Sequence, residues 1–304
     1  MAKSIGITMS RQIAAAVVEN HALVGSMRNY PEDRAQTDAL VELPMERLVE
    51  VITDQVLALC GKEKVEAVGL AVPGIIRGGV VEDSPNLPQL KGARITEAIT
   101  EALKQRNCTS VVNTLNDADA IAAGIAATRG QLDRLVRAWT LGYGIGFGRY
   151  PWSEGVWEGG HYCVSLDPKE KFCGCGGRGH LEGIMGHRAM RLRFFDLEPE
   201  EIFANAKKGD TRCVEFVKLW HRALSAGISN SIHMEGPGRF YFTGFNVGFL
   251  DLNLLRDALH QMVTMSPLQS YSLEIIPASD EVAVIGAAVV GLQAMTHGQS
   301  PLLS

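Results

Sequence analysis

The sequence predicts a mixed α/β protein built from two domains. Segments rich in β-branched residues alternate along the chain with segments whose apolar residues recur at helical spacing. This is the pattern of folds in which helices pack on sheets. The chain has 304 residues, of which 46% are hydrophobic and 21% charged. A globular chain of this length can form two domains of ordinary size.

The first half of the chain is expected to alternate strands and helices. Pro73-Gly74 ends a buried apolar segment, and Gly130 follows an alanine-rich helical segment as a stop signal. In order, we expect strands at residues 5–7 and 13–18 forming a hairpin, a helix at 45–59, a strand at 65–72, a helix at 95–104, a strand at 110–115 and a helix at 118–128.

The second half begins with a strand and a glycine-rich run at residues 142–148. Long amphipathic segments then predict several helices, and β-rich segments predict two further strands. In order, we expect a strand at 137–141, helices at about 183–195, 199–207 and 211–234, strands at 239–243 and 273–277, and an apolar helix at 281–295.

Composition and charge exclude several classes of protein. The formal net charge is −5 and no basic cluster is visible, which argues against nucleic-acid binding. No apolar run reaches the roughly 20 residues that span a bilayer, and the N-terminus has no apolar signal core. Four scattered cysteines fit buried thiols in a reducing compartment: Cys60, Cys108, Cys163 and Cys213. We therefore expect a cytoplasmic protein with neither membrane nor nucleic-acid partners.

A segment of twenty residues gathers four possible metal ligands, which are His161, Cys173, Cys175 and His180. Two thiolates and two imidazoles suit a tetrahedral structural Zn²⁺, and the glycines between them allow a tight turn around one ion. The alternative is a glycine-rich loop with two free cysteines and two surface histidines. Number, type and spacing of the ligands together favour the zinc site.

The same segment resembles the signature of the ROK family of bacterial sugar kinases and related repressors. The run E-G-G-H at residues 158–161 and C-G-C-G-G-R-G-H-L-E at 173–182 match the family pattern E-x-G-H and C-x-C-G-x-x-G-C-x-E. The last cysteine of the pattern is His180 here, and imidazole is an equally good zinc ligand. The resemblance implies a structural zinc, and it implies that Glu158, His161 and Glu182 bind a sugar.

The resemblance also implies a fold and an assembly. It implies a two-domain actin-like, ribonuclease-H-like sugar kinase fold with a central cleft, and relatives often form homodimers. We expect a smaller α/β domain at residues 1–116, joined by a C-terminal helix at about 290–304. A larger α/β domain at 117–289 is expected to carry the zinc site.

Three further motifs match the sugar side of the family's site. The runs V-P-G at 72–74, P-N-L at 85–87 and N-D-A at 116–118 occur in matching order. The resemblance implies that Gly74, Asn86, Asn116 and Asp117 contact the sugar, with Asp117 as the general base. The alternative for Asp117 is a helix cap, because aspartate is a preferred residue at a strand-to-helix junction. Asp119 stands where the family usually has Asn, and no role is assigned to it.

The nucleotide motifs of the family are degenerate here. The first hairpin reads T-M-S-R-Q at residues 8–12, where the family has D-x-G-x-T, and the role of Arg11 is open. The second loop keeps its glycines but carries a tyrosine at position 143, and Phe245 follows Gly244 where the family has G-G-G. Nucleotide contacts from the glycines are therefore a weak expectation, and Mg-ATP is a doubtful ligand. The residues concerned are Gly142, Gly144, Gly146 and Gly244.

Three functions follow from these patterns. The first is ATP-dependent phosphorylation of a hexose, an amino sugar or a related cyclitol, with Asp117 as base. The second is a sugar-binding regulatory protein that no longer binds ATP. The third is an enzyme that uses the same carboxylates for hydrolysis or isomerisation of a sugar. A repressor is not expected, because only four residues precede Ile5 and leave no room for a helix-turn-helix domain.

Overall fold

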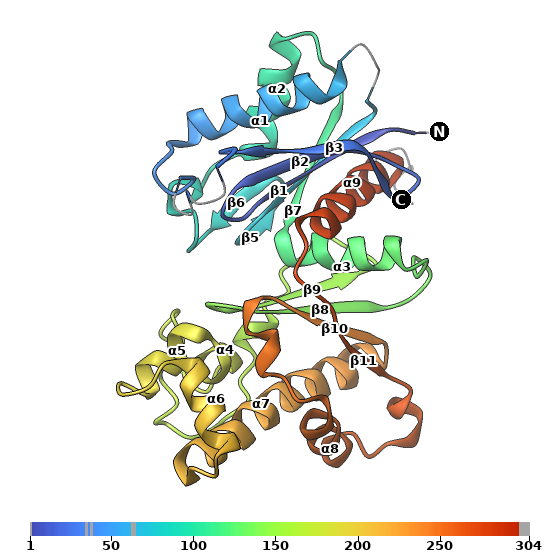
Figure 1. Ribbon diagram of the computed structural model, residues 1–304. Helices are drawn as coiled ribbons and strands as arrows, with labels where there is room; N and C mark the ends of the chain where they lie inside the picture. Colours follow the sequence, from blue (N-terminus) through green and yellow to red (C-terminus); the bar gives the residue numbers. More distant parts are fainter. Residues whose placement is uncertain (1, 34–35, 37–38, 62–64, 298–304) are drawn as a thin grey trace. The chain divides into compact units, whose positions relative to one another are not determined.

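The computed structural model describes residues 2–33, 36, 39–61 and 65–297. The chain divides into two compact units (Figure 1). The first unit comprises Met1–Val136, Gly148–Val156 and Ser279–Ser304, and the second comprises Arg137–Phe147 and Trp157–Ala278. Residues 298–304 of the predicted C-terminal helix lie outside the described residues.

A five-stranded sheet forms the centre of the first unit. Its strand order is β3-β2-β1-β4-β7. The β3–β2 and β2–β1 pairings are antiparallel, and the β1–β4 and β4–β7 pairings are parallel. The strands are β1 (Ser4–Met9), β2 (Ile13–Glu19), β3 (Ala22–Tyr30), β4 (Ala67–Val72) and β7 (Val111–Asn116), and a separate hairpin joins β5 (Ile75–Arg77) to β6 (Val80–Asp83).

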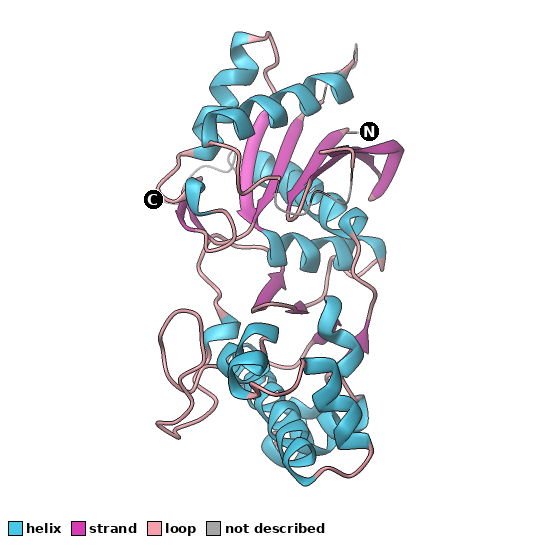
Figure 2. Ribbon diagram, turned by 60° about the vertical axis from the view of Figure 1, so that its left-hand side comes forward, coloured by secondary structure: helices cyan, strands magenta, loops and turns pink. Residues whose placement is uncertain are grey.

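Helices cover both faces of this sheet (Figures 1 and 2). Alternate residues of β2 point to opposite faces. Ile13 and Ala15 belong to the core that contains α1 and α2, whereas Ala14 and Ala16 belong to the core that contains α9. The helices of this unit are α1 (Met45–Cys60), α2 (Ile95–Gln105), α3 (Asp117–Thr128) and α9 (Asp280–His297), with a 3-10 turn at Pro88–Leu90.

Helix α9 packs unusually close to its neighbours through glycines. A Cβ atom added at Gly286 would lie 1.8 Å from the Ala120 carbonyl oxygen, and one at Gly124 would lie 1.8 Å from the Val282 carbonyl oxygen. A Cβ at Gly69 of β4 would lie 1.8 Å from the Ala287 carbonyl oxygen. The absence of these side chains lets α3, α9 and the sheet pack backbone to backbone.

This close packing groups α3 with the first unit. We expected the larger domain to begin at residue 117, but α3 belongs to the first unit, which continues to Val136. The reason is tertiary: α3 has no long apolar stripe of its own and packs against α9, more than 150 residues later in the chain. α9 clusters with the first unit, and the predicted domain bounds stay a prediction.

The second unit is built on a four-stranded sheet of order β11-β10-β8-β9, in which β10 and β11 are parallel. Trp139 of the sheet and Trp220 of the long helix α7 are fully buried in its core. The elements are β8 (Val136–Leu141), β9 (Ile145–Tyr150), α4 (Leu181–Met185), α5 (His187–Arg193), α6 (Pro199–Lys207), α7 (Thr211–Glu235), β10 (Arg239–Thr243), α8 (Leu252–Met262) and β11 (Ser272–Ile275), with 3-10 turns at Gly159–His161, Phe245–Phe249 and Ser266–Gln269.

Several elements differ from those expected. The helix predicted at 183–195 is two helices, because the backbone at Gly186 is extended and its amide donates to the Glu182 carbonyl at 2.8 Å. A Cβ atom at Gly186 would lie 2.8 Å from the Tyr143 carbonyl oxygen. β3, β5, β6 and α8 were not expected. β5 and β6 are short and much of β3 is exposed, which weakens the periodic signal, whereas the apolar face of α8 with Leu255 and Leu259 was overlooked.

Among the described residues, no helix has both the length and the hydrophobicity needed to cross a membrane.

We predict that Gly286→Ala destabilises the protein by about 2 kcal/mol or more, because the new methyl group must push α3 away from α9. Urea unfolding followed by circular dichroism measures the change. Gly248→Ala is the matched control, since a Cβ there meets nothing within 4 Å. Equal stabilities of the two variants would contradict the close packing.

Candidate functional site

The structure brings together the four ligands predicted from the sequence, hereafter the metal-ligand cluster: His161, Cys173, Cys175 and His180. One ligand atom from each residue lies within 4.8 Å of all the others. The Nδ1 atoms of the two histidines are 3.3 Å apart, and the two Sγ atoms are 3.3 Å apart. Mixed separations are 3.5 Å from Cys173 Sγ to His161 Nδ1 and 3.3 Å from Cys175 Sγ to His180 Nδ1.

These separations fit a tetrahedral zinc site. With the usual Zn–N and Zn–S bond lengths, tetrahedral angles place ligand atoms about 3.3 to 3.8 Å apart. Burial raises the pKa of the Cys173 thiol to about 12, so a thiolate at that position requires a cation beside it. The donor set and its spacing are therefore compatible with Zn²⁺.

Backbone hydrogen bonds hold the segment around the metal-ligand cluster. The amide of Val164 donates to the Gly179 carbonyl at 2.8 Å, and the amide of Leu181 donates to the Tyr162 carbonyl at 2.9 Å. Gly179 has a φ of +70°, and a Cβ there would lie 1.9 Å from the Ser165 carbonyl oxygen. A glycine is required at this point, just before His180.

Two carboxylates lie beside the metal-ligand cluster. Glu182 Oε2 accepts a hydrogen bond from the Ile145 amide at 3.1 Å, and Oε1 lies 3.5 Å from Cys173 Sγ. Glu158 Oε2 lies 3.9 Å from His161 Nε2. Burial raises the pKa of Glu158. The nearby charge of Glu182 also raises this pKa, while His161 lowers it. The second unit thus contains the acidic pair expected from the sequence.

The first unit brings together Gly74, Asn116 and Asp117. Asn116 caps α3: its Oδ1 accepts from the amides of Ala118 at 2.8 Å and Asp119 at 3.4 Å, and its Nδ2 donates to the Gly74 carbonyl at 2.9 Å. The capping residue is therefore Asn116, and Asp117 is the first residue of the helix. Its half-buried carboxylate lies at the helix N-terminus, where a negative charge is favoured.

Ser84 connects the segment of Asn86 to this group. Its hydroxyl donates to the Pro73 carbonyl at 2.6 Å and accepts from the Leu87 amide at 3.3 Å. Gly74 has a φ of +121°, and a Cβ there would lie 2.2 Å from the Asp83 carbonyl oxygen. Asn86 itself is exposed in the turn between these bonds. The sequence analysis did not single out Ser84.

Asp119, to which no role was assigned, is buried in the first turn of α3. Its Oδ1 accepts a hydrogen bond from the Arg149 amide at 2.9 Å. A Cβ atom at Gly148 would lie 1.9 Å from the Ala118 carbonyl oxygen, so the backbone at residue 148 packs directly on the start of α3. Asp119 therefore ties residues 148–149 to α3.

The glycines expected to contact a nucleotide are involved in contacts with other residues of the protein. The Gly142 amide donates to the Gly144 carbonyl at 3.0 Å, and a Cβ at Gly144 would lie 2.4 Å from Glu182 Oε2. Gly244 has a φ of +100°, and a Cβ there would lie 2.4 Å from the Leu141 carbonyl oxygen. Gly146 lies within β9. These glycines are needed for packing whether or not a phosphate binds.

Three rings form a ring cluster beside this turn: Tyr143, His187 and Phe245. Their centroids are 5.0 to 5.8 Å apart in edge-to-face pairs. Asn246 supports the cluster, since its Nδ2 donates to the Gly142 carbonyl at 3.1 Å and its Oδ1 lies 3.2 Å from His187 Nδ1. The sequence suggested Phe245 and Tyr143 but gave no signal for His187 and Asn246, which are far apart in the chain.

The hairpin β1–β2 closes tightly. The Ser10 amide donates to the Gln12 carbonyl at 3.0 Å, and Gln12 Nε2 donates to the Pro31 carbonyl at 2.9 Å. Thr8 is buried, and Arg11 is exposed. Thr8, at the position of the acid in the family motif, thus lies inside the sheet, and Gln12, at the position of the threonine, bonds to the Pro31 carbonyl.

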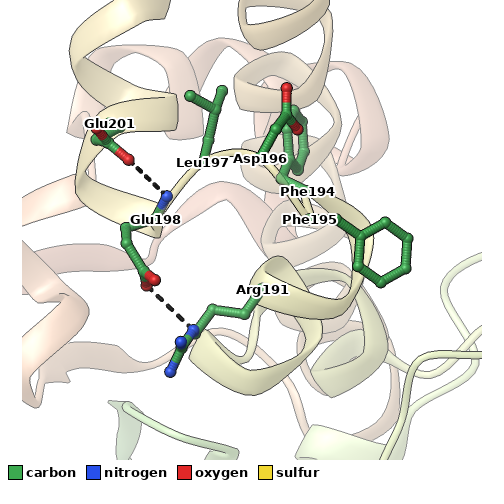
Figure 3. A pocket seen from close by; sticks show the side chains of 7 residues that line it. All are labelled: Arg191, Phe194, Phe195, Asp196, Leu197, Glu198 and Glu201. Carbon is green, nitrogen blue, oxygen red and sulfur yellow. Dashed lines mark hydrogen bonds and ion pairs between the residues drawn. The ribbon is translucent and has the colours of Figure 1, made fainter.

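A shallow hollow of about 250 Å³ lies at α5 and the start of α6 (Figure 3). The Arg191–Glu198 ion pair, 3.0 Å long, crosses it. Its lining includes none of the site residues predicted from the sequence, and it is formed by Arg191, Phe194, Phe195, Asp196, Leu197, Glu198 and Glu201.

The chain resembles known proteins in sequence and in fold over nearly its whole length. The chain is 27% identical over 307 residues to a glucokinase from Pyrobaculum calidifontis, which covers 95% of both proteins. The ROK hexokinase from Thermus thermophilus superposes with a TM-score of 0.79 at 23% identity, covering 97% of this chain and 100% of that one.

A ROK family glucokinase from Streptomyces griseus, solved with glucose and AMPPNP, superposes with a TM-score of 0.67 at 22% identity over 96% of this chain and 100% of that one. These neighbours establish the two-domain actin-like, ribonuclease-H-like fold expected from the sequence. The sequence profile of the ROK family matches residues 6–294. The chain belongs to the ROK family.

Proposed function

We propose that this protein is a sugar kinase that transfers a phosphoryl group from ATP to a hydroxyl of a hexose, with glucose as the first substrate to test. The relatives named above are glucokinases and a hexokinase. The observation that carries the proposal is the position of Asp117 at the first turn of α3, with Asn116 providing the helix cap. Oδ1 of Asp117 accepts a hydrogen bond from the Ala118 amide at 3.0 Å, which holds the carboxylate at the start of the helix.

Asp117 is proposed as the general base. A sugar hydroxyl is a weak nucleophile, and removal of its proton as it attacks phosphorus lowers the barrier. The carboxylate is half-buried, and the positive end of the α3 dipole favours its ionised form. An ionised Asp117 can accept the proton from the attacking hydroxyl.

The remaining polar groups are proposed to orient the sugar. In the first unit these are Gly74, Asn86 and Asn116. In the second unit, Glu158, His161 and Glu182 offer acceptors and a ring nitrogen. Carboxylates that accept bonds from sugar hydroxyls fix the ring without carrying out chemistry.

A structural zinc is proposed for the metal-ligand cluster of His161, Cys173, Cys175 and His180. The ion would stabilise thiolates that burial disfavours and fix the loop that carries Glu158 and Glu182. All four positions are filled by protein ligands, as in structural rather than catalytic zinc sites.

A second candidate is a sugar-binding protein that no longer uses ATP. Two amides of the glycine turn, those of Gly142 and Ile145, are bonded internally, and the ring cluster covers the turn beside them. Calorimetry with glucose and with Mg-ATP separates the two candidates. Heat of binding from both ligands supports the kinase, whereas binding of glucose without any binding of Mg-ATP establishes the second candidate.

For the kinase we predict that Asp117→Asn lowers turnover of glucose by about 10²- to 10⁴-fold, because the amide cannot accept the proton. Glucose affinity should change little, since the side chain keeps its size. A coupled assay of ADP release gives turnover, and calorimetry gives affinity.

The control for this variant is Asp133→Asn, at an exposed aspartate of the same unit that pairs with Arg134 at 3.2 Å. It should retain wild-type turnover. Full activity of Asp117→Asn would remove Asp117 from the role of base.

For the metal we predict close to one zinc per chain by elemental analysis of protein purified without chelators. His180→Ala removes one of four ligands, so its zinc affinity should fall by more than the roughly 10- to 100-fold that outer contacts contribute.

His260→Ala, at an exposed histidine of α8, should keep its zinc. A folded wild-type protein without bound metal would refute the ligand assignment.

A further inference from the structure

A buried ion pair involves a residue that is close in sequence to the metal-ligand cluster. Arg193, at the end of α5, donates from Nη1 to Glu170 Oε1 at 3.0 Å, and its Nη2 bonds to Glu170 Oε2. The guanidinium and carboxylate thus meet in a bidentate pair. Only 19% of the Arg193 side chain and 11% of the Glu170 side chain are exposed. None of the roles assigned above uses this pair.

Further contacts fix the guanidinium in place. It lies over the ring of Phe172 at 4.5 Å and near that of Phe216 at 5.6 Å. Its Nη2 also approaches the Gly183 carbonyl at 3.5 Å. The planar head of arginine can stack on rings and bind a carboxylate with two nitrogens at once, which the ammonium group of lysine cannot do.

In the sequence, the residues that contact Arg193 lie on both sides of the three ligands Cys173, Cys175 and His180. Glu170 and Phe172 precede Cys173, and Gly183 follows His180. The Glu170 carbonyl also accepts a hydrogen bond from the Gly179 amide at 2.7 Å. One side chain therefore ties together the two ends of the loop that holds three of the four ligands.

We propose that Arg193, through its pair with Glu170, is a positioning residue that preorganises the loop of residues 170–183 for its metal ion. The proposal rests on the zinc site proposed above. A loop that is already closed loses less conformational entropy when the ion binds, so the ion binds more tightly and leaves more slowly. Outer contacts of this kind commonly contribute tenfold or more to metal affinity.

A purely structural role would give a different result. If the pair only stabilised the second unit, its loss would lower the melting temperature with and without metal by similar amounts, and zinc affinity would not change. If it preorganises the loop, zinc affinity falls even in protein that remains fully folded at the temperature of the assay.

The test compares Arg193→Lys with the wild type. Lysine keeps the positive charge but cannot form the bidentate pair or stack on Phe172. Zinc affinity is measured at equilibrium by competition with a chromogenic chelator, and melting temperature is measured on metal-free and zinc-loaded protein. We expect Arg193→Lys to bind zinc about tenfold or more weakly.

The chain offers a matched control in Arg212→Lys. Arg212 makes a bidentate pair with Asp196 at 2.9 and 2.8 Å and lies over the ring of Phe194 at 4.3 Å. Its side chain is 53% exposed and that of Asp196 is 62% exposed. The same chemistry is thus present in the same unit without a contact to the metal loop, and zinc affinity of Arg212→Lys should equal that of the wild type.

The outcomes are distinct. Weaker zinc binding by Arg193→Lys alone supports the proposal; unchanged binding, or an equal loss in both variants, overturns it. Should Arg193→Lys fail to fold, Glu170→Gln is measured in the same way and decides by the same criterion. A wild type that binds no zinc refutes the proposed metal site, and this inference with it, whereas zinc bound equally by wild type and variant refutes only the inference.

Discussion

The convergence of four ligand atoms within 4.8 Å is the constraint on which the second unit depends. Burial raises the pKa of the Cys173 thiol, so the thiolate that ligates a metal is disfavoured there unless a cation is bound. A divalent cation removes this conflict. Glu158 and Glu182 flank the four ligands in the sequence, so a metal bound there would fix both carboxylates.

In the first unit, close backbone packing fixes the start of α3. Glycines allow α9 to contact α3 and the sheet through their backbones. Asn116 is the capping residue, since its side chain accepts from the Ala118 amide and donates to the Gly74 carbonyl. Asp117 is the first residue of the helix, and its Oδ1 accepts from the Ala118 amide as well. Sequence alone could not separate these two roles, because both residue types are good caps.

Features that depend on residues close in the sequence could be predicted, whereas features that depend on contacts between distant segments could not. The metal ligands lie within twenty residues and the strand-to-helix junction at Asn116 is a local feature, so both could be found in the sequence. The break at Gly186, the ring cluster and the Arg193–Glu170 pair depend on contacts between distant segments, which leave no fixed spacing. The grouping of α3 with the first unit has the same cause, since it depends on the contact of α3 with α9. The homodimer stays a prediction.

The central claim is that a metal-held loop presents carboxylates to a sugar. The most direct measurement is a crystal structure of the protein with glucose, with anomalous diffraction recorded on both sides of the zinc absorption edge. The account predicts an anomalous peak between His161, Cys173, Cys175 and His180, and glucose hydroxyls within hydrogen-bonding distance of Glu158 and Glu182. A map with no peak among those four side chains, or with glucose bound away from both carboxylates, would contradict it.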